Sequence, residues 1–205
     1  MQVSDAPPGL AAELDALIAE RAEGEFPPEA VRKGIRDLLR HGGFKPTGRN
    51  KPASEYLAKA AAAGRFPRIN NVVDVCNHVS LLSGIPISLL DLELALEGCS
   101  GLVLREAVAG ESFVFNASGQ VIELEGLVCV AREAGGPIGN AVKDSMGTKT
   151  RPETRDVLAV LYAARGLVGR DEVLALAEQM AAGLRTHAAA DTAEAWLLTP
   201  EDATR

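Results

Sequence analysis

One group of polar side chains in this chain is spaced closely enough to act on a ligand together. The group lies within eight residues and comprises Lys143, Asp144, Ser145, Thr148, Lys149 and Thr150. Hydroxyls, a carboxylate and two ammonium groups suit a polar ligand that carries an ester, carboxylate or phosphate. The surrounding residues 135–154 show no hydrophobic period and many turn formers, so we expect a long loop there. A loop of ~20 residues either has a function or is simply solvated, and the sequence leaves both explanations open.

A second polar group lies on a helix that we predict over residues 69–83. Asn70, Asp74 and Asn77 recur at i, i+4 and i+7, which places them along one stripe with His78 beside it. Apolar residues fill another stripe of the same helix. Asn is a weak helix former, so this polar stripe is unusual for a solvated face. We therefore take the four residues as candidate ligand contacts, although a hydrogen-bonded structural role is simpler for His78.

The chain contains none of the compact catalytic signatures that are recognised by spacing. It has no GxSxG, no HExxH, no GxxxxGK[ST] and no GxGxxG after a predicted strand. Asp74 and His78 have no third metal ligand near them, and Cys76, Cys99 and Cys129 form no CxxC pair, so we expect no metal and no cofactor. Three widely spaced cysteines favour a reducing cytoplasm. No stretch approaches the ~20 apolar residues of a membrane span.

The net charge of −7 is unevenly distributed along the chain. Residues 32–68 carry ten basic side chains against two acidic ones, which is a local net charge of +8. From charge alone, solvated helix faces that pair with the acidic remainder are the simpler explanation. The alternative is a phosphate-facing patch around the loop FKPTGRNKP, which contains Lys45, Arg49 and Lys51.

Hydrophobic periodicity predicts helices in the first half of the chain and strands in the second. The expected helices cover residues 9–22, 28–41, 53–63, 69–83 and 171–184. The expected strands cover residues 102–108, 112–116, 120–125 and 127–132. The apolar run 156–163 could be a strand or a helix. Helices followed by a run of short strands indicate an α+β domain rather than alternating βαβ units.

Three segments of this sequence together resemble the B3/B4 domain of the phenylalanyl-tRNA synthetase β-subunit. They are FPRINNVVDVCNHVSLLSGIPISLLD (66–91), GLVLREAVAGESFVF (101–115) and KDSMGTKTRPETRDVL (143–158). In that family the first segment reads R-(I/V)-x-N-x-V-D-x-x-N, followed by G-x-P and a final D. The matching residues here are Arg68, Asn70, Val73, Asp74, Asn77, Gly84, Pro86 and Asp91.

The resemblance implies a fold and a domain organisation. The expected fold is a layered α+β domain, with a mostly antiparallel sheet, helices packed on it, and helices added at both ends. The domain would cover residues 28–168, between a helical extension at 1–27 and a C-terminal helix and tail at 169–205. The implied partner is tRNA or aminoacyl-tRNA, with a free amino acid as an alternative, and neither DNA nor a membrane.

The resemblance also implies an activity, the hydrolysis of a wrongly attached amino acid from tRNA. Such a site places a water at the ester carbonyl and stabilises the oxyanion, with no metal and no covalent nucleophile. The alternative is a non-catalytic module that binds RNA or an amino acid. The chain has no class II synthetase core and no ATP site, so it is not expected to be a complete ligase.

Site residues follow from the positions that match the family. The expected catalytic residues are Asn77, Ser88 and Asp144, and Ser88 stands where bacterial synthetases have the histidine of P-M-H-A-F-D. A serine can place a water but takes up no proton near neutral pH. The expected substrate contacts are Asn70, Asp74, His78, Ser145, Lys149 and Thr150, and the expected RNA contacts are Lys45, Arg49, Lys51 and Arg68.

Overall fold

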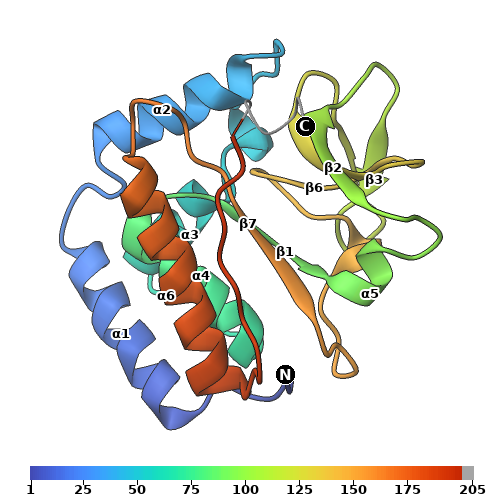
Figure 1. Cartoon of the computed structure of the whole chain (residues 1–205). Coiled ribbons are helices and arrows are strands. Elements are labelled where there is room, and N and C mark those ends of the chain that lie inside the picture. Colours follow the sequence, from blue (N-terminus) through green and yellow to red (C-terminus); the bar gives the residue numbers. More distant parts are fainter. Residues whose placement is uncertain (200–205) are drawn as a thin grey trace.

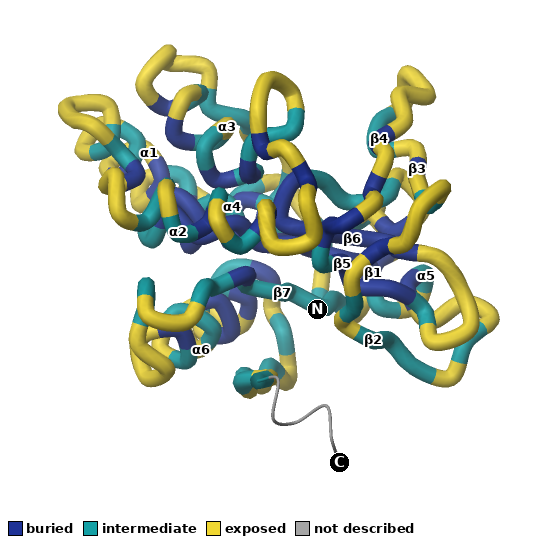
Figure 2. The backbone as a smooth tube through the Cα atoms, turned by 90° about the horizontal axis from the view of Figure 1, so that it is seen from above, coloured by how far each residue is buried: buried dark blue, intermediate teal, exposed yellow. Residues whose placement is uncertain are grey.

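The computed structural model describes residues 1–199 of the 205-residue chain. Figure 1 shows an α+β fold, in which the long helices gather on one side and most of the short strands on the other. The predicted fold class is therefore confirmed. Figure 2 shows that the buried backbone runs through the middle of the molecule, along α4 and the central strands, while the outer loops are exposed.

Helix α4 lies at the centre of the helical side. The helices are α1 (Pro8–Ala22), α2 (Glu29–Arg40), α3 (Ala53–Ala62), α4 (Asn71–Ser83) and α6 (Arg170–Ala188), with the short α5 (Leu92–Ala95) at the other side. α4 packs against α1, α3, α6 and the first strand, which explains why apolar residues occupy most of its surface. Within residues 1–199, no helix has the length and apolar character that a membrane crossing requires.

Within residues 1–199 the strands form three separate antiparallel sheets. β1 (Ile87–Asp91) pairs with β7 (Val157–Leu161). β5 (Val128–Arg132) lies between β2 (Leu102–Glu106) and β6 (Pro137–Asn140). β3 (Ser112–Val114) and β4 (Val121–Glu123) make a hairpin. The antiparallel arrangement is as expected, and the run at 156–163 is a strand.

Two strands lie where no strand was expected from the sequence. β1 is buried at every position, so its sequence ISLLD has no alternation to reveal it. β6 and the 3-10 turn η2 (Met146–Thr148) lie inside residues 135–154. The prediction of one long loop without regular structure was therefore wrong there. α6 continues to Ala188, so His187 belongs to a helix rather than to the tail.

Two glycines hold the end of α2 against the turn between β4 and β5. The backbones of Gly42 and Gly126 approach so closely that a Cβ on either residue would overlap the carbonyl group of the other. Gly126 also has a φ of +74°, which side chains rarely adopt. The loop that follows Gly42 is fastened at its far end by a hydrogen bond of 2.9 Å from Ala53 N to Ala141 O. These contacts seat the basic loop, which we define as residues 44–51, beside the segment that follows β6.

Candidate functional site

A buried polar cluster forms where β1 meets the ends of β6 and β7. Ser88 has no exposed surface, and its hydroxyl donates to the Asn140 carbonyl at 3.2 Å and lies 3.0 Å from the Tyr162 hydroxyl. The Asp144 carboxylate accepts a hydrogen bond of 3.0 Å from Leu89 N of the same strand. The cluster therefore joins three segments that lie far apart in the sequence.

Gly139 leaves the space in which Ser88 and Asp144 converge. A Cβ added at Gly139 would meet Asp144 Oδ1 at 2.7 Å and Ser88 Oγ at 3.1 Å. Asn140 then turns the chain, because its Oδ1 accepts from Val142 N at 2.8 Å and from Lys143 N at 3.0 Å. This turn directs the Asp144 side chain back over β1.

Burial makes Asp144 an unusual carboxyl group. Loss of solvent raises its pKa to about 6, although the nearby Ser88 hydroxyl, the hydrogen bond from Leu89 N and the charge of Lys149 act in the opposite direction. Its Oδ1 atom has no hydrogen-bond partner among residues 1–199. A carboxyl group with a pKa in this range can exchange a proton with a bound water near neutral pH.

Cys76 of α4 lies close enough to Asp144 to sense its charge. Burial, and secondarily this carboxylate, raises the pKa of the Cys76 thiol far above its usual range. Burial also raises the pKa of Tyr162, with the same carboxylate contributing. Both groups stay protonated, so Cys76 is not an activated nucleophile. Among residues 1–199 there is no group of three side chains that could hold a metal ion.

The other residues expected in the 143–150 segment mainly shape it. Ser145 accepts a hydrogen bond of 3.2 Å from Gly147 N and so begins the η2 turn. The ammonium group of Lys149 donates to Phe115 O at 2.7 Å, from where its charge acts on Asp144. Thr150 is half-buried. The structure thus brings Ser88, Asp144 and Lys149 together.

The polar residues of α4 do not join this cluster as one stripe. Asn70 lies before the helix and caps it by accepting from Val73 N at 2.9 Å. Asp74 is buried and accepts from Ile69 N at 3.1 Å, and burial raises its pKa. Asn70 and Asp74 line a separate pocket of about 340 Å³ against α1.

His78 and Asn77 lie in different surroundings on α4. Burial lowers the pKa of His78, which senses the charges of Glu13 in α1 and His187 in α6. This location between three helices suits the structural role that the sequence favoured. Asn77 is half-buried, and no hydrogen bond of its side chain is found among residues 1–199. Its amide is therefore available to a ligand.

The basic segment divides into paired and unpaired cations. Arg36 binds Glu55 through two bonds of 2.6 Å, Asp37 pairs with Lys33 and Arg40, and Arg68 pairs with Asp15 of α1. Within residues 1–199, no ion pair is found for Lys45, Arg49, Lys51, Lys59 or Arg65. Some of these cations thus form ion pairs on helix faces, as the simpler explanation expected. Others, including those of the basic loop, form no ion pair and could contact phosphate groups.

Lys143 connects the basic loop to the buried polar cluster. Its ammonium group donates to Arg49 O at 2.8 Å and lies 4.3 Å from the centre of the Phe115 ring. Burial lowers its pKa, and the charge of Arg49 adds to the effect. The basic loop thus contacts the segment that carries Asp144 through Lys143, and the charge of Lys149 reaches Asp144 itself.

Sequence reasoning missed Cys76, Asn140 and Tyr162 as parts of this site. It named Lys143 but not the contact of Lys143 with the basic loop. Tyr162 had one detectable signal, since it is an aromatic residue directly after an apolar strand in a chain with few aromatics. Asn140 had none, because its role depends on β6, which was not expected.

Comparison with known proteins places this architecture in a family. The family model for the B3/4 domain matches residues 45–197. The chain belongs to the B3/4 domain family. This is the domain of the phenylalanyl-tRNA synthetase beta chain, and it indicates a tRNA-related function. The matched region of the B3/4 domain includes the basic loop from Lys45 onward and the whole buried polar cluster.

A relative outside the synthetases is also similar to this B3/4 domain protein. It is the tRNA modification GTPase MnmE of Rhizorhabdus wittichii, which is 31% identical over 181 residues. The similarity covers 86% of this chain but only 38% of the relative. The chain thus spans well under half the length of that protein, whose name also refers to tRNA.

Proposed function

We propose that this B3/4 domain protein binds aminoacyl-tRNA and hydrolyses the ester of a wrongly attached amino acid in trans. The observation that carries the proposal is that the basic loop is fastened to the segment that carries Asp144, through the bond from Lys143 to Arg49 O and the bond from Ala53 N to Ala141 O. Cations bind the phosphate backbone, and a polar cluster beside them suits the aminoacylated end of the same molecule.

The chemistry requires a positioned water and a proton acceptor. In the proposed reaction, the Asp144 carboxylate takes a proton from a water as that water attacks the ester carbonyl carbon. The bond to the ribose oxygen then breaks, and that oxygen takes up a proton to give the free tRNA end. The pKa of about 6 makes Asp144 a suitable acceptor near neutral pH.

Three further residues have proposed roles around this reaction. Ser88 is fully buried and bonded to Tyr162 and Asn140, so we assign it to positioning Asp144 rather than to contact with substrate. Asn77 is proposed to contact the substrate through its unpaired amide. The charge of Lys149, which acts on Asp144, is proposed to stabilise the developing oxyanion.

The test is to incubate the purified chain with a panel of correctly and wrongly charged tRNAs and to follow the loss of ester. At least one should be deacylated faster than in buffer, with a rate that rises with pH through about 6. Asp144→Asn should lose this acceleration, whereas Glu123→Gln on the exposed β4 should keep it. If no charged tRNA is hydrolysed faster than in buffer, the catalytic proposal is wrong.

A non-catalytic tRNA-binding module is the second candidate. The observation that favours it is Ser88, which cannot take up a proton and whose hydroxyl is already engaged inside the protein. This candidate predicts salt-dependent binding of tRNA without acceleration of ester loss. GTP hydrolysis is not carried over from the similar relative, because this sequence has no GxxxxGK[ST] phosphate loop.

A further inference from the structure

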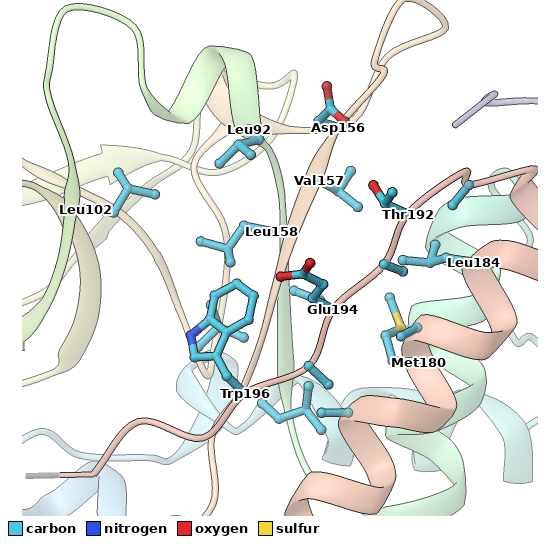
Figure 3. A pocket seen from close by; sticks show the side chains of 18 of the residues that line it. Leu92, Leu102, Asp156, Val157, Leu158, Met180, Leu184, Thr192, Glu194 and Trp196 are labelled. Carbon is cyan, nitrogen blue, oxygen red and sulfur yellow. The ribbon is translucent and has the colours of Figure 1, made fainter. Parts of the chain in front are cut away.

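A cavity of about 670 Å³ lies along the outer edge of β7, with α6, β2 and the C-terminal segment around it. Figure 3 shows Leu158 of β7 and Leu102 of β2 on one side, Met180 and Leu184 of α6 on the other, and Trp196 in the segment that crosses in front. Its lining does not include Ser88, Asp144 or the basic loop. The cavity is therefore separate from the site proposed for tRNA.

The outer edge of β7 presents unpaired backbone groups to this cavity. β7 pairs only with β1, and Tyr162 N donates to Pro86 O at one end of that ladder. Because alternate residues of an antiparallel strand face the partner, Val157, Ala159 and Leu161 turn their N–H and C=O groups the other way. Within residues 1–199, no hydrogen bond to these outward groups is found.

The C-terminal segment covers the cavity without pairing with β7. From residue 192 to residue 199, exposed and half-buried positions alternate, as in an extended chain. The segment is tied to α6, because Ala190 N donates to Leu184 O at 3.2 Å and the Arg185 guanidinium donates to Ala193 O. It forms no ladder with β7 and instead makes one wall of the cavity.

We propose that the outer edge of β7 accepts an extended peptide of a partner protein as an added strand. The cavity volume falls within the range of ligand sites, ~300–1,000 Å³, but a purely apolar small molecule would leave the backbone groups of β7 without partners. An added strand pairs them and places alternate side chains against the aliphatic walls of α6 and β2. This proposal is independent of the tRNA function.

The charges at the rim of the cavity define the chemistry of the peptide. Asp156, Asp191 and Glu194 lie in the lining. The Arg155 guanidinium, bonded to the carbonyl oxygens of Pro152 and Thr154, and the ammonium group of Met1 also belong to the lining. Three carboxylates thus face two cations, which leaves a net negative charge at the rim. We therefore expect the partner's peptide to carry Val or Leu at alternate positions, and Lys among the residues between them.

The first test uses a panel of fluorescein-labelled heptapeptides of this composition, titrated into the full chain by fluorescence anisotropy. Each peptide is also made with N-methyl groups on alternate backbone amides, in both registers. One register should weaken binding at least about tenfold, because those amides face β7, and the other should be tolerated. Equal binding in both registers, or no binding of any peptide, would overturn the proposal.

The second test fills the cavity from the protein side. Ala177→Trp on the cavity wall of α6 should weaken peptide binding at least about tenfold, while Ala175→Trp on the exposed face of the same helix should change it less than about twofold. Circular dichroism checks that both variants fold. Peptide binding that is unchanged by Ala177→Trp would overturn the proposal, and so would a cavity that takes an apolar dye or a second copy of this chain but no peptide.

Discussion

At the scale of single residues, Asp144 combines burial, an unpaired oxygen and contact with a strand backbone. Its pKa of about 6 lies above the 3.8 of an ordinary aspartate, so the folded state binds the proton more tightly than the unfolded state does. Ionisation of Asp144 therefore destabilises the fold as pH rises through the window from about 4 to about 6.

The stability of Asp144→Asn tests this electrostatic penalty. The variant carries no charge, so above pH ~7 its free energy of unfolding should exceed that of the parent, by about 2 to 3 kcal/mol at most. The gain should shrink as pH falls through the same window, because the parent carboxyl becomes protonated. Urea unfolding at several pH values measures this difference in free energy of unfolding, with Glu123→Gln as the control. A gain that is independent of pH would contradict the assigned pKa.

Gly139 provides a second prediction at this scale. In Gly139→Ala the new methyl group meets Asp144 Oδ1 at 2.7 Å and Leu90 Cδ2 at 3.1 Å, so we expect a loss of stability. Overpacking of this kind costs about 1 to 3 kcal/mol. Thermal or urea unfolding measures the loss, and Gly136→Ala, whose Cβ meets nothing within 4 Å, is the control. The double variant with Asp144→Ala should lose less than the sum of the single changes, because it removes one of the clashing groups.

The sequence could predict part of this site. The segment around Asp144 was recognisable from its dense mixture of hydroxyls, carboxylate and ammonium groups. The partners of Asp144 were not recognisable, because Asn140 and Tyr162 reach it only through the pairing of β1 with β7 and of β5 with β6. For α4, helical spacing placed Asn70 on a stripe, but its side chain caps the helix instead. The expected roles of these residues in catalysis and binding stay predictions.

At the scale of structural elements, the basic loop should be the main source of salt dependence in tRNA binding. Changing Lys45, Arg49 and Lys51 together to Ala should reduce the slope of log K against log salt by about 2, because each phosphate contact contributes about 0.7 to 0.9. Filter binding or anisotropy over a range of salt concentrations measures the slope.

A matched triple variant supplies the control for the basic loop. Lys33, Arg40 and Arg68 changed to Ala remove the same formal charge, but all three already form ion pairs with Asp37 or Asp15. We expect a clearly smaller change in slope. Equal changes for both triples would mean that overall charge, and not the loop, determines binding. The clearly smaller change that we expect would count against the predicted RNA contact at Arg68.

The strands were predictable from the sequence where one face of the strand meets solvent and the other is buried. The four strands expected between residues 102 and 132 are present as β2 to β5, with shorter bounds. β1 and β6 were missed because both are buried at every position, which removes the alternation on which strand prediction depends. β6 also has Pro, Gly and Asn in four residues, a composition that is typical of turns.

At the scale of the whole molecule, α1 is part of the shared core. Leu10 and Leu14 are buried in the same cluster as Val72 of α4 and Met180 of α6. Leu14→Ala should therefore cost about 2 to 5 kcal/mol of global stability, measured by urea unfolding. Ala16→Ser on the exposed face of α1 should cost less than about 0.5 kcal/mol. A small effect of Leu14→Ala would support the expected boundary at residue 27, with α1 as a dispensable extension.

The contact between Gly42 and Gly126 also bears on how this protein can vary over time. Because each backbone occupies the space of the other's missing side chain, neither position can accept even alanine unless α2 and the β4–β5 turn move apart. No replacement at one position can compensate for a change at the other. A descendant that loses either glycine must rebuild the junction from which the basic loop starts. We therefore expect the two glycines to be kept or lost together, and relatives that lack both to present their cations to RNA from a different place.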